Sequence, residues 1–217
     1  MHPQLHPLST LPTPATRARW NLAELRGRLV EISAPQASAT LTAAFGLVLD
    51  AQQSGEPAAW ITLCESSFFP LDAAEGGVDL DRLPVVRTPD ARTAAWAGDQ
   101  LVRSSGFGLV VLDLGGRLPG AGSPPLRVPA GLQQRLAGLA QAHGTAVVFL
   151  TGKSADAPSL GSLIALRAEA RRLPGFDEGG AGAAGFSCRI EVRVLKDKRR
   201  GPGRMHAEVC RGPAGLY

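Results

Sequence analysis

The stretch that decides the fold runs from residue 28 to residue 49 and reads RLVEISAPQASATLTAAFGLVL. It opens with a short apolar run that ends at Ala34-Pro35. Apolar residues then recur at the spacing of one helix face, at Leu41, Ala44, Phe45, Val48 and Leu49. The helical pattern stops near Gly55. The stretch therefore predicts a strand, a tight turn and a helix.

The same alternation continues along the chain. Further short apolar runs lie at 58–63, 83–87, 109–114 and 145–150. Helical patterns lie at 91–103 and around residues 132–140. Apolar runs of four to six residues between amphipathic helices are typical of a parallel sheet buried on both faces. We therefore expect an α/β fold with a mostly parallel central sheet flanked by helices.

The alternation ends after Thr151. Residues 162–172 fit a strand or a helix, whereas 188–196 and 205–211 fit an antiparallel hairpin around a turn at 198–203. In the hairpin, Ile190, Val192 and Val194 fall on one face, and Arg189, Glu191 and Arg193 fall on the other.

Length and composition predict one folded domain with a tail. The chain has 217 residues, of which 44% are hydrophobic, enough to bury a substantial core. No stretch approaches the roughly 18 apolar residues of a membrane span, and no signal peptide is recognisable, so we expect a cytoplasmic protein. Residues 1–19 contain four prolines and predict a disordered arm, which leaves 20–217 as a single core domain.

The turn after the first strand lies where nucleotide-binding folds hold phosphates at a helix N-terminus. In the pattern G-x-x-x-x-G-K-[ST], the two glycine positions hold Ala34 and Ala39. The lysine position holds Thr40, and the hydroxyl position holds Leu41. No lysine precedes Lys153 in the chain. We therefore expect no ATPase activity; a plain turn that never bound a nucleotide remains the alternative.

Other signs of catalysis or of a cofactor are weak. The four histidines are scattered, and the three cysteines are too far apart in sequence for a paired zinc spacing. No serine nucleophile stands in a recognisable frame. We expect no catalytic residues, no metal and no cofactor.

Positive charge gathers near the C-terminus. Residues 189–211 hold eight basic and three acidic side chains, whereas the rest of the chain holds 15 basic and 16 acidic ones. The candidate contact residues are Arg193, Lys196, Lys198, Arg199, Arg200 and Arg204. They fit non-specific contact with DNA phosphates, contact with an acidic protein, or a solvated surface with no partner. The segment has no aromatic residue for stacking on bases.

Large apolar residues in predicted loops favour a protein partner. Trp20 precedes the core, and Phe68 and Phe69 follow the second predicted strand. All three are larger than a loop needs, so we expect them to be exposed and to take part in oligomer or partner docking.

Several stretches together resemble RecA-type recombinases, in order along about 190 residues. Residues 27–42 resemble the opening strand and phosphate loop, 77–86 the segment after the second strand, and 108–114 the Walker B strand. Residues 162–172 resemble the strand after the second DNA-binding loop, and 189–217 the terminal strands of the core. The resemblance implies a RecA-like core, with Asp113 at the Walker B position.

Two segments differ from RecA, and these differences narrow the set of RecA-related families that the chain resembles. Only about ten residues, 152–161, stand where RecA has its longer second DNA-binding loop, and the Gly/Pro-rich stretch 115–129 replaces the first. We expect no further C-terminal domain. With the phosphate loop erased, Asp113 has no magnesium to reach and is expected to be structural.

This combination is similar to the ImuA family and more distantly to the cell-division inhibitor SulA. ImuA proteins imply a non-catalytic role in SOS-induced translesion DNA synthesis and mutagenesis, with an ImuB-like Y-family protein, an error-prone polymerase and RecA as partners. SulA implies inhibition of the tubulin-like division protein instead, and weak DNA binding or residual NTP binding is a further alternative. RecA protomers dock through a segment that precedes the core, which implies that residues 1–26 contact RecA or a second copy.

Overall fold

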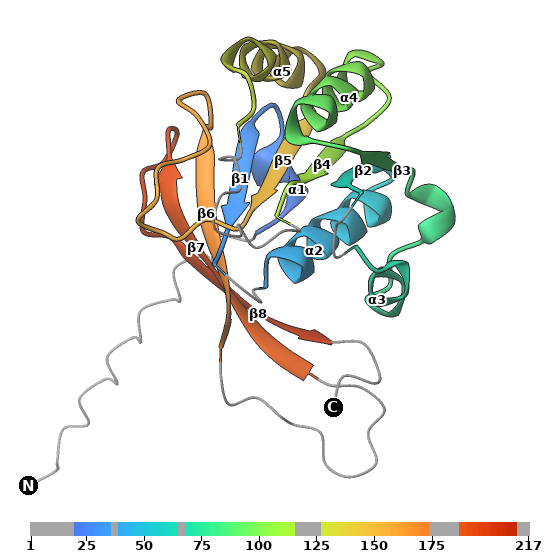
Figure 1. Cartoon of the computed structure of the whole chain (residues 1–217). Helices are drawn as coiled ribbons and strands as arrows, with labels where there is room; N and C mark the ends of the chain where they lie inside the picture. The colour runs from blue at the N-terminus through green and yellow to red at the C-terminus, as the bar shows by residue number, and fades with distance from the viewer. Residues whose placement is uncertain (1–19, 36–38, 65–67, 116–126, 174–186, 212–217) are drawn as a thin grey trace, which may run out of the picture.

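The computed structural model describes residues 20–35, 39–64, 68–115, 127–173 and 187–211 (Figure 1). The helices are α1 (Leu22–Leu25), α2 (Thr40–Gln53), α3 (Pro70–Glu75), the 3-10 helix η1 (Leu80–Arg82), α4 (Ala91–Arg103) and α5 (Ala130–His143). The strands are β1 (Leu29–Ser33), β2 (Ala58–Leu63), β3 (Val85–Thr88), β4 (Leu109–Asp113), β5 (Ala146–Thr151), β6 (Leu166–Leu173), β7 (Ser187–Asp197) and β8 (Met205–Arg211). The predicted arm, residues 1–19, lies outside the described residues.

Eight strands form one mixed sheet in the order β3-β2-β4-β5-β1-β6-β7-β8. The pairs from β3 to β6 are parallel, whereas β6–β7 and β7–β8 are antiparallel. β1 therefore lies deep in the parallel part, between β5 and β6. The predicted α/β architecture with a C-terminal antiparallel hairpin is confirmed.

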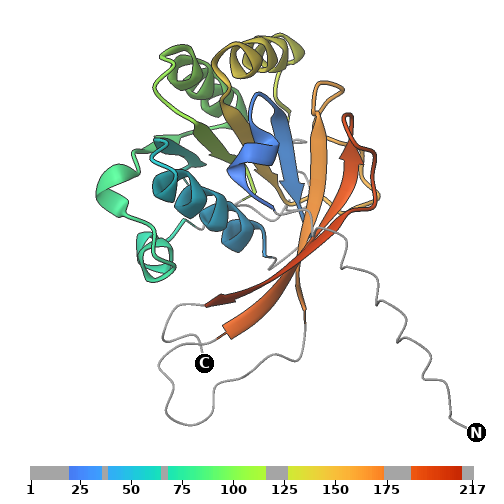
Figure 2. The ribbon, with the colours of Figure 1, turned by 180° about the vertical axis from the view of Figure 1, so that it is seen from behind.

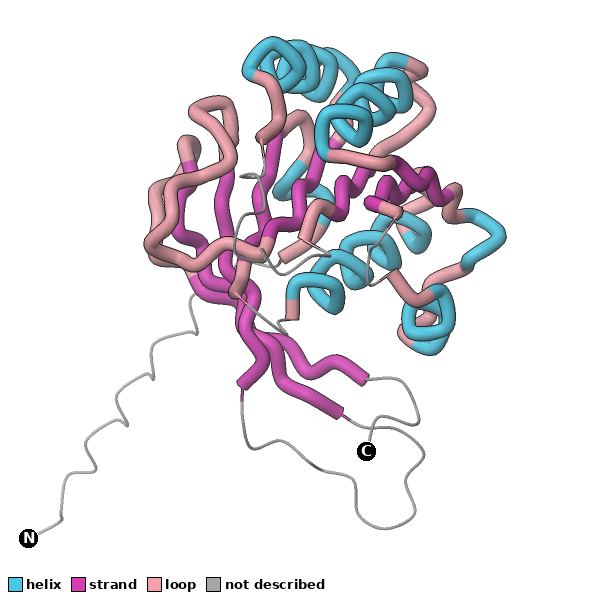
Figure 3. The backbone as a smooth tube through the Cα atoms, viewed as in Figure 1, coloured by secondary structure: helices cyan, strands magenta, loops and turns pink. Residues whose placement is uncertain are grey.

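Helices cover the two faces of the sheet unequally (Figures 1 and 2). One core cluster joins α1, α2 and α3 to one face, and a second joins α4 and α5 to the other. The central strands β1, β4 and β5 are buried along their whole length because helices pack on both sides of them. β6, β7 and β8 continue past the helices as a twisted ribbon, which Figure 3 shows in magenta.

The sequence pattern located most elements closely. The α4 helix and the β2 and β8 strands have the predicted bounds, and residues 166–173 resolve the strand-or-helix ambiguity in favour of a strand. The hairpin faces are also as predicted, because Ile190, Val192 and Val194 are buried. The short helices α1, α3 and η1 were not predicted, because three to six residues carry too little periodicity.

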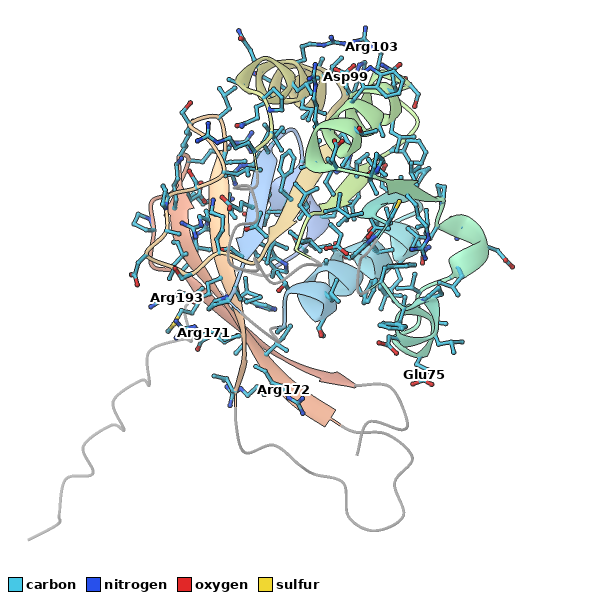
Figure 4. All side chains as sticks on the ribbon, viewed as in Figure 1. Glu75, Asp99, Arg103, Arg171, Arg172 and Arg193 are labelled. Atoms are coloured by element: carbon cyan, nitrogen blue, oxygen red, sulfur yellow. The ribbon has the colours of Figure 1, made fainter. Side chains whose placement is uncertain are left out.

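A buried carboxylate joins the two helices on one face to partly exposed arginines. Arg135 of α5 donates through Nε and Nη2 to the Asp99 carboxylate of α4 at 3.1 and 2.7 Å, and Arg103 donates to the same group at 3.0 Å. Asp99 is fully buried, so the bidentate contact offsets the loss of its hydration. Figure 4 shows Asp99 and Arg103 at this end of the molecule.

Gly46 and Gly144 both have open space around them but differ in backbone conformation. Replacing each by alanine therefore tests helix propensity at Gly46 and backbone strain at Gly144. A Cβ atom added at Gly46 or at Gly144 would meet no atom within 4 Å. Gly46 lies inside α2, whereas Gly144 ends α5 in the left-handed region with φ 68°. We expect Gly46→Ala to raise the free energy of unfolding by about 0.5–1 kcal/mol and Gly144→Ala to lower it by about 1–2 kcal/mol. Urea unfolding of both variants measures the two effects, and shifts of equal sign would contradict this account.

Candidate functional site

The predicted phosphate turn lies at the carboxyl edge of the parallel strands. Ala34 ends the run of β1 and its backbone N–H donates to the Thr151 carbonyl at 3.2 Å, so the chain leaves β1 beside the end of β5. The α2 helix begins at Thr40 after Ala39, which provides no side-chain cap. Residues 36–38 of this turn lie outside the described residues. The strand and the helix that flank a phosphate turn are therefore both in place, but the residues of the phosphate-binding pattern are not.

The side chains at the four positions of the phosphate-binding pattern are apolar or enclosed. Ala34 and Ala39 are 3% and 2% exposed, and Thr40 is also buried. Leu41 is half-buried and packs against the core beneath α2. A leucine side chain cannot ligate a cation, and here it contributes to the packing of the helix. The helix dipole remains as an attraction for an anion, typically worth ~0.3–1 kcal/mol.

Asp113 ends β4 at the same edge and is 2% exposed. Its carboxylate accepts the Thr62 hydroxyl and the Gly115 backbone N–H, each at 3.3 Å. Thr88 continues the chain of hydrogen bonds by donating to the Thr62 carbonyl at 3.3 Å. These contacts join the ends of β2, β3 and β4, which is consistent with the structural role that was predicted for Asp113.

A buried carboxylate that was not predicted as a site residue lies in the middle of β1. Glu31 is fully buried and accepts the Thr151 hydroxyl at 3.0 Å and the Leu160 N–H at 2.8 Å. Lys153 forms an ion pair with it at 2.9 Å, and Arg167 lies 3.8 Å away. The sequence held a signal, since a charged residue inside a buried apolar strand needs compensation.

Arg167 of β6 holds the segment after β5 from the other side. Its guanidinium donates to the Ser154 carbonyl at 2.6 Å, to the Ala157 carbonyl, and to the Ser33 hydroxyl of β1. Glu31 and Arg167 together pin residues 151–160 to the carboxyl edge of the sheet. The segment that was expected to stand in place of a second DNA-binding loop is thus packed against β1 and β6.

A second buried carboxylate lies where the predicted hairpin enters its turn. Asp197 accepts the Arg28 guanidinium at 2.5 Å, the Arg199 N–H at 2.8 Å, and the Arg204 guanidinium. Burial alone would raise the pKa of Asp197, but the Arg199 and Arg28 hydrogen bonds and the charges of Arg28 and Arg204 lower the pKa below its ordinary value. Arg204 is therefore committed to an ion pair inside the protein.

Other basic residues of the hairpin also contact the protein itself. Arg200 pairs with Glu24 at 2.5 Å, and Lys198 donates to the Ser162 carbonyl at 2.7 Å. Lys196 is half-buried; burial first, and then the charges of Lys198 and Arg167, lower its pKa. Arg199 is exposed. Part of the positive charge that clusters here in the sequence is therefore paired with groups of the protein itself, in contacts that hold the hairpin to the core.

On the ribbon itself, two arginines share one buried carboxylate. Glu169 of β6 accepts Arg171 at 2.8 Å and Arg193 of β7 at 3.0 Å, and Figure 4 shows the two arginines beside each other. Their side chains are 54% and 41% exposed, whereas that of Glu169 is 1% exposed. This group therefore carries an excess of one positive charge, with both guanidinium groups accessible. Arg171 was not predicted, because only its strand pairing places it near Arg193.

The three aromatic residues predicted to be exposed lie in different environments. Phe68 is 5% exposed and contacts the rings of Phe45 and Trp60, so its predicted exposure is wrong: the loop folds it into the core. Phe69 is 62% exposed, as predicted. Trp20 is half-buried against the core below α1. The sequence could not separate the adjacent phenylalanines, because a single aromatic pair carries no periodicity.

Comparison with known proteins points to RecA. The RecA N-terminal domain family matches residues 23–121. RecA of Picosynechococcus sp. is 31% identical over 204 residues, which cover 83% of this chain and 58% of that protein. RecA of Synechocystis sp. is 29% identical over 205 residues, covering 83% and 57%. RecA of Rhodospirillum rubrum is 39% identical over 88 residues, covering 41% of this chain and 24% of that protein.

The match extends across the described elements and beyond the family segment. The chain spans a little more than half the length of the two cyanobacterial RecA proteins. Sheet order, the flanking helices and the C-terminal antiparallel strands agree with the sequence similarity. The protein has a RecA-like fold and is similar in sequence to RecA proteins.

The ion pairs of Asp197 make the free energy of unfolding depend on pH in a defined direction. Because the folded pKa lies below the unfolded value of about 3.9, the carboxylate stabilises the fold above that value and this contribution is lost as pH falls through the folded pKa. We expect Asp197→Asn to lower the free energy of unfolding by about 3 kcal/mol at pH 7 and by less at pH 3. Urea unfolding at both pH values measures this. The exposed Asp156→Asn is the matched control, and an equal loss in both variants would contradict the assignment.

Proposed function

We propose that this chain is a non-catalytic RecA-like accessory protein of SOS-induced translesion synthesis and mutagenesis. In this role it acts by contact, as a scaffold for an ImuB-like Y-family protein, an error-prone polymerase, or RecA. The observation that carries the proposal is the phosphate turn, which keeps its strand–turn–helix frame but holds Ala34, Ala39, Thr40 and Leu41 at the four chemical positions. The family similarity supports a RecA-like context of DNA repair.

The energetics of the turn argue against tight nucleotide binding. Micromolar affinity requires roughly 8 kcal/mol of binding free energy. The helix N-terminus supplies about 1 kcal/mol at most when exposed to solvent. The lysine position holds Thr40, and the position of the magnesium-binding hydroxyl holds Leu41. Selection for ATP turnover would not leave Leu41 packed against the core.

Exposed apolar side chains support a protein partner. Phe69 and Leu71, at the start of α3, are 62% and 75% exposed, and Trp96 of α4 is 56% exposed. Exposed large apolar groups of this kind are found at protein interfaces. No helix among the described residues is long and apolar enough to span a membrane. We place the partner contact on α3, where apolar side chains are exposed, rather than on the basic hairpin, where Arg204 is held by the buried Asp197.

Weak DNA contact is a second role with an observation of its own. Arg171 and Arg193 share the single carboxylate of Glu169 and keep 54% and 41% of their side chains exposed. Such guanidinium groups fit phosphate oxygens without reading base sequence. A salt-sensitive, non-specific affinity would then accompany the protein contacts.

Calorimetric titration with Mg-ATP tests the nucleotide claim. We expect no binding in the micromolar range and no phosphate release from the natural chain. Restoring the pattern with Ala34→Gly, Ala39→Gly, Thr40→Lys and Leu41→Thr together is expected to create measurable binding, because the strand and the helix are already in place. Micromolar binding by the natural chain would overturn the proposal.

Co-purification with separate candidate partners tests the scaffold claim. We expect capture of an ImuB-like protein or RecA, and a loss of about tenfold or more when Leu71→Asp places a charge on the exposed face of α3. Gln134→Asp adds the same charge at an exposed position of α5, on the other face of the sheet, and is the matched control. Capture of the tubulin-like division protein alone would favour the SulA-like role and contradict the mutagenesis role.

A further inference from the structure

Two of the three cysteines lie directly opposite each other in the sheet. β7 and β8 pair antiparallel, and their register places Cys188 of β7 opposite Cys210 of β8. The pairing of residues 187–193 with residues 205–211 contains no register shift. Twenty-one residues separate the two cysteines in the sequence, so it is the pairing of the strands that brings their backbones together.

The type of strand pair sets the distance between the two backbones. Near the turn, the Val194 N–H donates to the Arg204 carbonyl at 2.8 Å, which marks a hydrogen-bonded pair. Hydrogen-bonded and non-hydrogen-bonded pairs alternate along antiparallel strands. Cys188 lies six residues from Val194, and Cys210 lies six residues from Arg204, so the cysteines again form a hydrogen-bonded pair. The Cα atoms of such a pair lie about 5.5 Å apart, which is also a common Cα separation in disulfides.

The cysteine pair lies just beyond the three-stranded part of the ribbon. Among the described residues, the last β6 partner of β7 is Leu173, opposite Arg189, so the pair follows one residue later. Figure 1 shows this end of β7 and β8 beyond the helices. The other end of β7 is held to the core, because Asp197 forms ion pairs with Arg28 and Arg204.

A two-stranded end both benefits from a covalent bond and can adjust to it. Two strands without a third neighbour are at best marginally stable in water. The Cβ atoms of a hydrogen-bonded pair lie about 5.5 Å apart, whereas those of a disulfide lie about 3.8 Å apart. Strand ends that have no third strand beside them can make this small shift without disturbing the rest of the sheet.

The third cysteine is too distant to compete for this bond. Cys64 follows β2, which stands five places from β7 in the sheet order. Adjacent strands lie about 4.8 Å apart, so β2 and β7 are separated by about 24 Å. The Cα atoms of a disulfide lie within about 7 Å of each other. Cys64 therefore cannot bond to Cys188 or Cys210 within one folded chain.

We propose that Cys188 and Cys210 are the site of an oxidative modification, a disulfide bond across the open end of the β7–β8 hairpin. Glutathione disulfide is a sufficient oxidant. One cysteine thiolate attacks it and releases a first glutathione, and the other cysteine thiolate attacks the resulting mixed disulfide and releases the second. The two thiols give up two electrons and two protons, which convert glutathione disulfide into two glutathione thiols. The inference is independent of the proposed function.

A glutathione redox titration of the full-length protein tests the proposal. After acid quenching and alkylation, mass spectrometry measures the disulfide-linked tryptic peptides 173–189 and 205–211. The titration gives the effective concentration of one cysteine thiol at the other. We expect this concentration to be higher by about tenfold or more in native buffer than in urea that unfolds the protein, because the strand register holds the two residues together.

A register control separates strand pairing from closeness in sequence. Val209→Cys together with Cys210→Ser moves the thiol by one residue, to the position opposite Arg189 and onto the other face of the strand. The loop that the bond closes hardly changes in length, so we expect the ratio between native buffer and urea to fall to about one. Cys64→Ser is expected to keep the natural ratio.

A smaller ratio in the natural chain, or the same ratio in the register control, overturns the proposal. Linked peptides that contain Cys64 in the native protein would also overturn it. The same holds if the oxidised protein runs as a disulfide-bonded dimer on a non-reducing gel.

Discussion

The rest of the structure depends on how the charge of Glu31 is compensated. Glu31 lies in β1, with β5 on one side and β6 on the other, and has lost all contact with water. A buried carboxylate without partners would cost several kcal/mol. Lys153 and the Leu160 N–H come from the segment after β5, and Arg167 comes from β6. Satisfying this one group therefore requires the parallel sheet, the following segment and the sixth strand to assemble in one arrangement.

Similar compensation recurs where the antiparallel ribbon meets the core. Asp197 joins Arg28, at the entry of β1, to Arg204, at the entry of β8, and Glu169 joins β6 to β7 through Arg193. Buried ion pairs contribute more to a specific arrangement than to net stability, since the desolvation of both charges opposes their attraction. The same interactions leave fewer basic side chains free to contact a partner. Arg171, Arg193, Arg199 and Arg200 keep exposed side chains and are thus better placed for outside contact than Arg204.

The strand and helix beside the predicted phosphate turn need no bound nucleotide to hold them together, which fits the proposed non-catalytic role. The strand, turn and helix around residues 29–53 are stabilised by apolar packing, to which Leu41 now contributes. None of that packing requires a phosphate. Asp113 likewise contacts Thr62 and Gly115 in a network among strand ends that needs no metal ion. A RecA-like frame can therefore serve as a surface for partners, as the proposed function requires.

The sequence by itself determined the α/β class, the positions of the long helices and strands, the hairpin, and the changed residues of the phosphate turn. These follow from periodicity and from residue identity, which are local properties. Tertiary packing was needed to show that Phe68 is buried while Phe69 is exposed, that Arg171 joins Arg193 at Glu169, and that Arg200 pairs with Glu24 and Arg204 with Asp197. Each of these depends on strand register or on packing between residues far apart in the chain. Composition gives the number of charged and aromatic residues, whereas the fold decides which group neutralises each charge and which residues cover each ring.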